Sequence, residues 1–543
     1  MRRALIAVSF LACSESTTEP TNGEAVDTPD HALADAPAQD TETPHDTDEA
    51  DVAEPPLPKV GPESRGLIAL RGALHVHSIF SHDACDGRTD ELPDAPDCLA
   101  DFRAQLCTSG LDFAFLTDHP SNMSSYPFQQ LLLHDAAAGD TLTLGPSGGP
   151  FSNTIACAET VGGPARPVFL TVGFEGTHTM PIGLEGHLVP AELERVSLKD
   201  ETPEADRKAV VDAIHAQGGV VALAHSEEPD LSAETIAALP IDAMEQYNMH
   251  ANILRILEDD ISQLFALERF MDGAEDPPSA DLVLLAMLDT FPEPAIEKWY
   301  AVSAVRPITG VLGSDVHQNV TTDGYCTPGG EFESFCGSLE EAYPVLVGNL
   351  KKGGPLRLGD GKRIDSYERV FRWLHNRVYA TEASAMGVRE GIRSGRTVSV
   401  FTVFGEPYGL DLYATCDGCE LTELGGTVSL AKAPKIEVTG PGAPLPQGWV
   451  EWLPEEAHAA EIETHLIGYG PTGERIIDVT VSGGEAASPG AGSRLTFTPD
   501  APGRYHVEVL IRPKHLVRVL RAEAPLADVT YRWAITNPIY VTP

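Results

Sequence analysis

A repeated pattern of short apolar runs between residues 61 and 400 constrains the fold more than any other feature of the sequence. The runs lie at 67–74, 112–116, 168–174, 220–224, 241–244 and 309–312. Amphipathic stretches, for example 204–217 and 251–270, separate several of them. Apolar runs that alternate with helical patterns indicate βαβ units and a mainly parallel sheet. Because the region is long enough for a complete barrel, we predict an α/β fold with a TIM-like barrel over residues 61–400.

The pattern changes after residue 400. Short extended segments follow one another, separated by turns rich in Gly and Pro, at 409–414, 435–439, 476–481, 494–498 and 503–511. Such a succession is typical of a β-sandwich. We therefore predict a β-rich, sandwich-like C-terminal domain over residues 401–543.

Side chains that can bind metals follow the apolar runs. Eleven of the 18 histidines lie between residues 75 and 317. The residues that come at or directly after a run are His75, His77, Asp118, His119, Glu175, His225, Asp315 and His317. The carboxyl ends of barrel strands meet on one face, and residues i and i+2 of a strand point to the same side. Neutral imidazole and carboxylate are ligands for zinc, iron or manganese, so the sequence predicts a metal site.

The charge balance is strongly acidic. The 81 Asp and Glu residues outnumber the 37 Lys and Arg residues, which gives a formal net charge of −44. No Lys/Arg-rich run concentrates positive charge, so we expect no nucleic-acid binding through charge. No stretch of the sequence approaches the roughly 18 consecutive apolar residues that a membrane-spanning helix needs.

Residues 1–13 have the order of an export signal. A basic start at Arg2 and Arg3 precedes an apolar stretch at 4–12, and Cys13 follows directly. This order resembles a bacterial lipoprotein signal peptide, which implies lipidation of Cys13. We expect an exported protein that is anchored to a bacterial membrane only by this lipid. The outer membrane is the favoured one, and the protein would face the periplasm or the cell surface. The alternatives are an ordinary cleaved signal peptide and a fortuitous apolar start with a spare cysteine.

Residues 14–60 have the composition of a linker. Thirteen acids and no Lys or Arg lie between Ser14 and Pro58. Such a segment cannot bury enough apolar surface to offset the entropy of ordering it. We predict a disordered acidic linker that holds the folded part of the chain away from a membrane.

Eight cysteines remain after Cys13, and an even number in an exported chain favours disulfide bonds. Cys326 and Cys336 lie in one Gly-rich loop and are expected to close it. Cys416 and Cys419 flank Asp-Gly, which suits a tight turn, and no second CxxC motif is present to complete a zinc site. A structural disulfide is therefore expected there, and the pairing of the other four cysteines stays open.

The strand-end motifs resemble a known family. In order along the chain they are His75-Val-His77-Ser, Thr117-Asp118-His119, Gly173-Phe-Glu175, Ala224-His225 and Gly313-Ser-Asp315-Val-His317. Together they resemble the PHP (polymerase and histidinol phosphatase) family over residues 72–320. The segment 533–541 resembles the tail of exported bacterial PHP proteins that carry a β-domain. The resemblance implies a distorted (β/α)7 barrel, two or three divalent metal ions and, usually, hydrolysis of phosphate esters.

The resemblance also implies which residues are metal ligands. One ion would be bound by His75, His77, Glu175 and Asp315. Glu175 would bridge to a second ion bound by His187 and His225, and a third ion would be bound by Asp83, His119 and His317.

Several of these assignments have alternatives. His82 is the alternative to Asp83, and His178 is the alternative to His187. Asp118 is expected to orient other groups rather than to bind an ion. Glu245 ends a strand and either lines the mouth of the site or has a packing role.

These residues predict a metal-dependent hydrolase of the phosphoesterase class. A water molecule bound to the ions would attack the phosphorus of a small-molecule or polymeric phosphate mono- or diester. No Ser/His/Asp nucleophile elbow and no phosphate-binding Walker loop occur in the sequence, and no side chain is assigned as catalytic. The alternatives are a metal-dependent hydrolase of C–N or C–O bonds and a non-catalytic metal-binding surface lipoprotein.

Overall fold

The computed structural model describes residues 59–86, 96–158, 166–253, 265–271, 273–288, 294–322, 326, 328, 333–447, 450–486, 488–490 and 492–543. The predicted signal peptide, Cys13 and all but the last two residues of the predicted linker lie outside this range. No helix in the described part of the chain is long and apolar enough to cross a bilayer.

The largest sheet in the described ranges is mixed and has 13 strands. Its hydrogen-bonded order is β13 (Thr427–Ser429), β20 (Ile539–Thr542), β18 (Gly503–Arg512), β19 (Tyr531–Thr536), β11 (Thr397–Val400), β10 (His375–Ala380), β1 (Ile68–Val76), β2 (Phe113–Leu116), β5 (Pro167–Val172), β4 (Pro150–Ala156) and β3 (Thr141–Leu144). A further strand, β15 (Glu461–Tyr469), pairs with β18 and with β16 (Arg475–Glu485). The pairs β1–β2 and β2–β5 are parallel, as expected for βαβ units.

Two smaller sheets complete the strand arrangement of the described residues. One contains β6 (Met180–Ile182), β7 (Val220–Leu223), β8 (Ala243–Asn248) and β9 (Thr309–Gly313), of which the last three are parallel. The other contains β12 (Asp411–Thr415), β14 (Lys435–Thr439) and β17 (Arg494–Phe497). Strands β7, β8 and β9 are buried along their whole length, which explains the continuous apolar sequence of β7, whereas β8 also buries the polar residues Glu245, Gln246 and Asn248.

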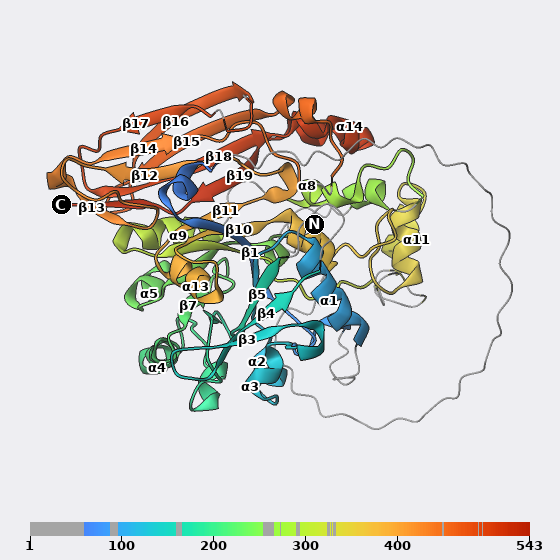
Figure 1. The fold of residues 1–543 in the computed structure, drawn as a ribbon. Helices are drawn as coiled ribbons and strands as arrows, with labels where there is room; N and C mark the ends of the chain where they lie inside the picture. The colour runs from blue at the N-terminus through green and yellow to red at the C-terminus, as the bar shows by residue number, and fades with distance from the viewer. Residues whose placement is uncertain are drawn as a thin grey trace, which may run out of the picture. The chain divides into compact units, whose positions relative to one another are not determined.

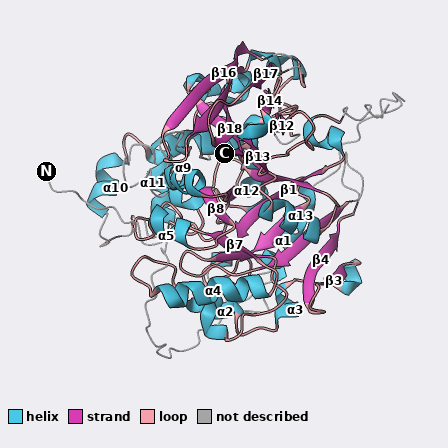
Figure 2. Cartoon of the chain, turned by 90° about the vertical axis from the view of Figure 1, so that its left-hand side faces the viewer, coloured by secondary structure: helices cyan, strands magenta, loops and turns pink. Residues whose placement is uncertain are grey.

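The helices lie around the strands (Figure 2). They are α1 (Pro96–Thr108), α2 (Pro120–Met123), α3 (Phe128–Leu131), α4 (Glu204–Ala216), α5 (Ala233–Ala238), α8 (Leu284–Met287), α9 (Pro294–Val305), α10 (Glu333–Leu339), α11 (Pro344–Lys352), α12 (Tyr367–Trp373), α13 (Ala385–Arg393) and α14 (Val517–Leu520). Helix α4 shows why such segments are helical: Val210, Val211 and Ile214 share one buried face, and Glu204 lies in the first turn, where an acid interacts well with the helix dipole. It packs on β7, while α9 packs on β8.

An apolar core lies between the large sheet and the four-stranded sheet. It includes Leu74 of β1, Phe115 of β2, Ala222 of β7, Ala243 of β8 and Val311 of β9, all with at most 1% of their surface exposed. The two sheets also meet at one end, where the backbone N–H of Asp315 donates to the carbonyl of His75 at 2.7 Å. The carboxyl ends of β1 and β9 are therefore fixed next to each other.

The predicted closed barrel is not present among the described strands. Residues Ile68–Gly72 of β1 pair antiparallel with β10, so β9 can reach β1 only beyond that segment, around Val76. The edge that a barrel would close is thus already paired with β10, and the sheet extends through β11 into the C-terminal strands. Figure 1 shows these strands, in orange and red, beside β10 and β11.

The sheet continues across residue 400, where we predicted a domain boundary. Strand β11 pairs with β10 on one side and with β19 on the other. The side chain of Asn537 links the same regions: it accepts from the N–H of Gly310 at 2.7 Å and donates to the carbonyls of Gly310 and Thr397, both at 3.0 Å. Residues 60–543 form one compact unit in which β9 is fixed by a side chain near the C-terminus.

Candidate metal centre

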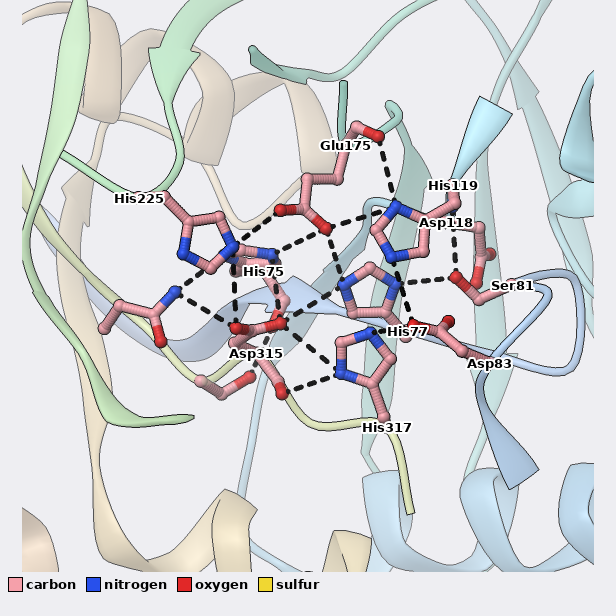
Figure 3. A network of polar contacts seen from close by, with 12 residues as sticks. His75, His77, Ser81, Asp83, Asp118, His119, Glu175, His225, Asp315 and His317 are labelled. Carbon is pink, nitrogen blue, oxygen red and sulfur yellow. Dashed lines mark hydrogen bonds and ion pairs between the residues drawn. The ribbon is translucent and has the colours of Figure 1, made fainter. Parts of the chain in front are cut away.

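Eight of the nine predicted ligands converge at the carboxyl ends of the parallel strands (Figure 3). They come from β1 and the loop after it (His75, His77, Asp83), from the segment after β2 (His119), after β5 (Glu175), after β7 (His225) and after β9 (Asp315, His317). Residues separated by up to 242 positions in the sequence thus share one cluster. The strand ends bring them together because all these strands run in the same direction.

Four atoms at the centre of the cluster surround a common point. The Nε2 atom of His75 lies 3.3 Å from Glu175 Oε2 and 3.3 Å from Asp315 Oδ1. The Nε2 atom of His77 lies 3.2 Å and 3.4 Å from the same two oxygens. These spacings match the distance of about 3.4 Å between ligands at two corners of a tetrahedron with metal–ligand bonds of about 2.1 Å.

None of these four buried atoms has a hydrogen-bond partner, and the same is true of Asp83 Oδ1 and His317 Nε2. Buried polar atoms without a partner are rare, because each costs about 1–3 kcal/mol. A cation bound between them would satisfy several at once, so the residues present fit a metal ion.

The two carboxylates at the centre use both oxygens. Glu175 faces His75 and His77 with Oε2 and lies 2.8 Å from His225 Nε2 with Oε1. Asp315 likewise places Oδ2 at 3.7 Å from His225 Nε2. A carboxylate with imidazoles on both oxygens is suited to bridging two neighbouring cations.

A second part of the cluster lies beside the first. Asp83 Oδ2 is 3.4 Å from His119 Nε2 and 3.5 Å from His317 Nε2, and the ring of His77 stacks on that of His317 with centroids 3.7 Å apart. Two sets of four residues therefore each offer ligand atoms within 4.8 Å of one another: His77, Asp83, His119 and His317, and His75, Glu175, His225 and Asp315.

Burial and charge set the protonation states of these groups. Burial alone would raise the pKa values of Glu175 and Asp315, but the facing imidazoles, His75 foremost, hold both well below their usual values. Burial, together with the neighbouring His77, lowers the pKa of His317 to about 3. Burial opposes a charge on His75 and His225, but the facing carboxylates hold the pKa values of both well above normal, so these two rings would release a proton when a metal ion binds.

Three of the ligands have a backbone conformation that most residues avoid. The φ angles of His75, His225 and Asp315 are 57°, 49° and 52°. The left-handed region costs an L-residue roughly 1–2 kcal/mol, and such strain is concentrated at functional sites. It turns each strand end so that the side chain faces the cluster.

The remaining predicted ligand, His187, is in neither set. Its Nδ1 lies 3.2 Å from Glu194 Oε1 and its Nε2 lies 3.0 Å from the carbonyl of Tyr126, so both ring nitrogens have partners elsewhere. The alternative, His178, pairs with Asp230 at 2.8 Å and does not join a set either. Where the resemblance implied His187 on the second ion, the structure therefore offers only His225, with Glu175 and Asp315.

The structure also locates the residues of the other open assignments. Asp83 belongs to a set, whereas His82 is exposed, with Nδ1 3.2 Å from the hydroxyl oxygen of Ser121. Asp118 accepts from the backbone N–H of Ser78 at 2.5 Å and from its hydroxyl at 2.8 Å. It thereby holds the residue that follows His77 in the chain and lies outside both sets of ligand atoms.

Sequence reasoning missed the groups that support the ligands. The hydroxyl of Ser81 lies 2.8 Å from His77 Nδ1, and Glu227 Oε1 lies 3.0 Å from His225 Nδ1. Glu245, predicted to line the mouth or to pack, is fully buried with Oε1 2.7 Å from His75 Nδ1. An acid directly after the apolar run at 241–244 was the available signal, because a buried carboxylate needs a hydrogen-bonding partner.

The eight cysteines that follow Cys13 are paired. The pairs Cys326–Cys336 and Cys416–Cys419 are present as predicted, and the other two are Cys85–Cys98 and Cys107–Cys157. Cys85 lies two residues after Asp83, and its partner Cys98 is in α1. This disulfide therefore anchors the loop that carries one of the ligands.

Comparison with known proteins adds one structural match. No protein-family model matches the chain, and no curated protein matches it either. Among solved structures, a match is the crystal structure of a two-domain protein containing a predicted PHP-like metal-dependent phosphoesterase from Bacteroides vulgatus ATCC 8482. It shares 12% sequence identity, the match covers 83% of this chain and 92% of that one, and the TM-score is 0.28. Because so low a TM-score carries no inference about activity, the function has to be argued from this chain's own residues.

Proposed function

We propose that this protein is a metal-dependent phosphoesterase of the PHP type, with two or three divalent ions bound by the eight clustered residues. One observation carries the proposal: buried imidazole nitrogens and carboxylate oxygens from five strand ends surround common points at ligand-to-ligand spacings, and six of these atoms have no hydrogen-bond partner. Zinc, manganese and iron all suit this set of donors. The order of the motifs along the chain supports the family assignment.

The residues of this chain would bind and orient the ions and leave one side of the cluster open. When bound, divalent ions supply a water activated at neutral pH and neutralise the charge on phosphoryl oxygens. His75 and His77 are fully buried and Asp83, His119 and His317 are 6–9% exposed, whereas the side chain of His225 is 24% exposed. We infer that a phosphate ester approaches from the side of His225, while Glu175 and Asp315 would keep the ions close together.

A substrate panel tests the proposal. Anaerobically purified protein is first analysed for metals and then assayed with phosphate mono- and diesters beside amide and carboxylic-ester substrates. We expect phosphoesterase activity that is abolished by chelation and by His77→Ala, and that survives His215→Ala, a matched change of a histidine paired with Asp242 outside the cluster. Turnover of carbonyl substrates alone would overturn the phosphoester assignment. Bound metal without any turnover that depends on His77 would identify a non-catalytic metal-binding protein.

We also propose that the protein is exported and anchored to the outer membrane through a lipid on Cys13. The order of residues 1–13 supports this, and so do the four disulfides of the described chain, because disulfides persist mainly in oxidising compartments. Expression of a Cys13→Ser variant in a bacterial host provides the test. The wild-type protein should be in the membrane fraction and the variant in the soluble fraction, and equal distribution of the two would contradict a lipid anchor.

A further inference from the structure

A single buried carboxylate, Glu245 on β8, contacts two of the candidate ligands. Its Oε1 lies 2.7 Å from His75 Nδ1, and both side chains are 0% exposed. Because a carboxylate only accepts, Nδ1 keeps its proton when the ring is neutral, and Nε2 then offers its lone pair towards Glu175 and Asp315. Its Oε2 accepts from the backbone N–H of His225 at 2.8 Å. The carboxylate therefore fixes both the tautomer of His75 and the left-handed backbone of His225.

Asn248, three residues further along β8, extends the same support to a third ligand. Its Nδ2 donates to Asp315 Oδ2 at 3.2 Å and to Glu245 Oε2 at 3.3 Å. A Cβ atom at Gly313 would lie 1.8 Å from Glu245 Oε1, so any larger residue at this position would displace the carboxylate. Glycine at position 313 is thus required to accommodate the carboxylate between β8 and β9.

These contacts reach only one of the two sets of ligands. His75, His225 and Asp315 belong to the set completed by Glu175, and each is fixed by Glu245 or by Asn248. The carboxylate of Glu245 contacts His75, His225 and Asn248. The buried serine and aspartate, Ser81 and Asp118, support the other side of the cluster instead.

We propose that Glu245 is a positioning residue that determines the affinity of the His75–Glu175–His225–Asp315 centre for its ion, independently of the His77–Asp83–His119–His317 centre. This inference rests on the metal-binding part of the proposed function and not on the reaction that the ions promote. A partner that orients a ligand imidazole commonly changes metal affinity by about 10–100-fold when it is replaced. Replacement of Glu245 should therefore weaken metal binding at the first of these centres and not at the second.

Glu245→Gln tests this with almost no change in volume. A glutamine can still accept from His75, but its amide then faces the N–H of His225 and the amide of Asn248, so two donors lose their acceptor. Glu194→Gln is the matched control: Glu194 is also 0% exposed, and its Oε1 lies 3.2 Å from His187 Nδ1 and accepts from the N–H of Leu188 at 2.8 Å. Each metal-free protein is titrated with Mn²⁺ in a calorimeter, and bound ions are counted by elemental analysis.

We expect Glu245→Gln to weaken one class of Mn²⁺ sites by 10–100-fold and to leave the other within about twofold of the wild-type value. Glu194→Gln should match the wild type at both classes. Combining Glu245→Gln with Asp83→Asn should weaken both classes of sites, with additive losses, because the two changes act on different centres.

Two results would overturn the inference. The first is a Mn²⁺ titration of Glu245→Gln that is the same as that of the wild-type protein. The second is an equal loss of Mn²⁺ affinity at every site, which would mean that Glu245 supports only the fold. If Glu245→Gln does not fold, Asn248→Ala, which leaves the carboxylate in place, should weaken the same class of sites, and an unchanged titration would refute the proposal. A selective loss of metal in a protein without phosphoesterase activity would leave this inference standing and reject the proposed reaction.

Discussion

The left-handed backbone at His225 predicts an unusual order of stability for two substitutions at this position. We compare His225→Ala with His225→Gly, both of which remove the imidazole. At most positions alanine is the more stabilising of the two by roughly 0.5–1 kcal/mol, because glycine loses more conformational freedom on folding. At His225 the φ angle is 49°, in the region that costs an L-residue roughly 1–2 kcal/mol and glycine nothing. The order should therefore reverse, with the glycine variant more stable by about 0.5–1 kcal/mol.

His119 provides the internal control, because it belongs to the same cluster but has a φ angle of −65°. His119→Ala should be more stable than His119→Gly by roughly 0.5–1 kcal/mol, as at ordinary positions. Urea unfolding of the four chelated variants, followed by circular dichroism, measures both differences without any contribution from metal binding. An alanine variant at His225 that equals or exceeds the glycine variant would refute the claim that this ligand is held in a strained conformation.

Three further outcomes can be checked on the same protein. Chelation should lower the free energy of unfolding by about 2.7 kcal/mol for each ion whose free concentration is a hundred times its dissociation constant. Thermal unfolding with and without Mn²⁺ measures this loss, and coincident melting curves would argue against bound ions. Although burial would raise the pKa of Asp140, hydrogen bonds from Arg103 and its other donors lower it from 3.8 to about 2, so Asp140→Asn should lose about 2 kcal/mol at neutral pH. Because a depressed carboxyl pKa stabilises the fold only above the unfolded value, this difference should shrink as the pH falls from 3.8 towards 2, and a difference independent of pH in urea titrations would contradict it. Replacing both Cys85 and Cys98 by serine should weaken Mn²⁺ binding severalfold, because the loop that carries Asp83 loses its disulfide anchor. Calorimetry measures the affinity, and the circular dichroism spectrum should be unchanged. An unchanged affinity would show that other contacts fix the loop.

The sequence was a good guide to where the candidate ligands lie. Asp315 and His317 follow the apolar run that becomes β9, and His75 and His77 occupy alternate positions at the end of β1. Strand periodicity and the common direction of parallel strands were sufficient to predict that these residues, far apart in the chain, lie at one edge of the sheets. Metal binding by this cluster remains a prediction for the experiments above.

Features that depend on tertiary partners could not be predicted in the same way. The motif around His187 is indistinguishable in sequence from a ligand motif, and only the fold shows that Glu194 and the carbonyl of Tyr126 engage its ring. Glu245 was predicted to line the mouth of the site or to pack, because its contact with His75, 170 positions away, could not be read from the sequence. Likewise, apolar patterning predicts strands without specifying which edges pair, so the sequence could not indicate that β10 pairs with the edge of β1 where a barrel would close.

Because the side chain of Asn537 supports β9 at Gly310, the cluster has its full support only after the end of the chain has been synthesised. The strand that leads into Asp315 and His317 depends on an amide that leaves the ribosome more than two hundred residues after it. A nascent chain can therefore have all its candidate ligands outside the ribosomal tunnel and still lack the group that fixes the last two. Loading with cations should accordingly be a late event, which follows release of the polypeptide rather than accompanying its translation.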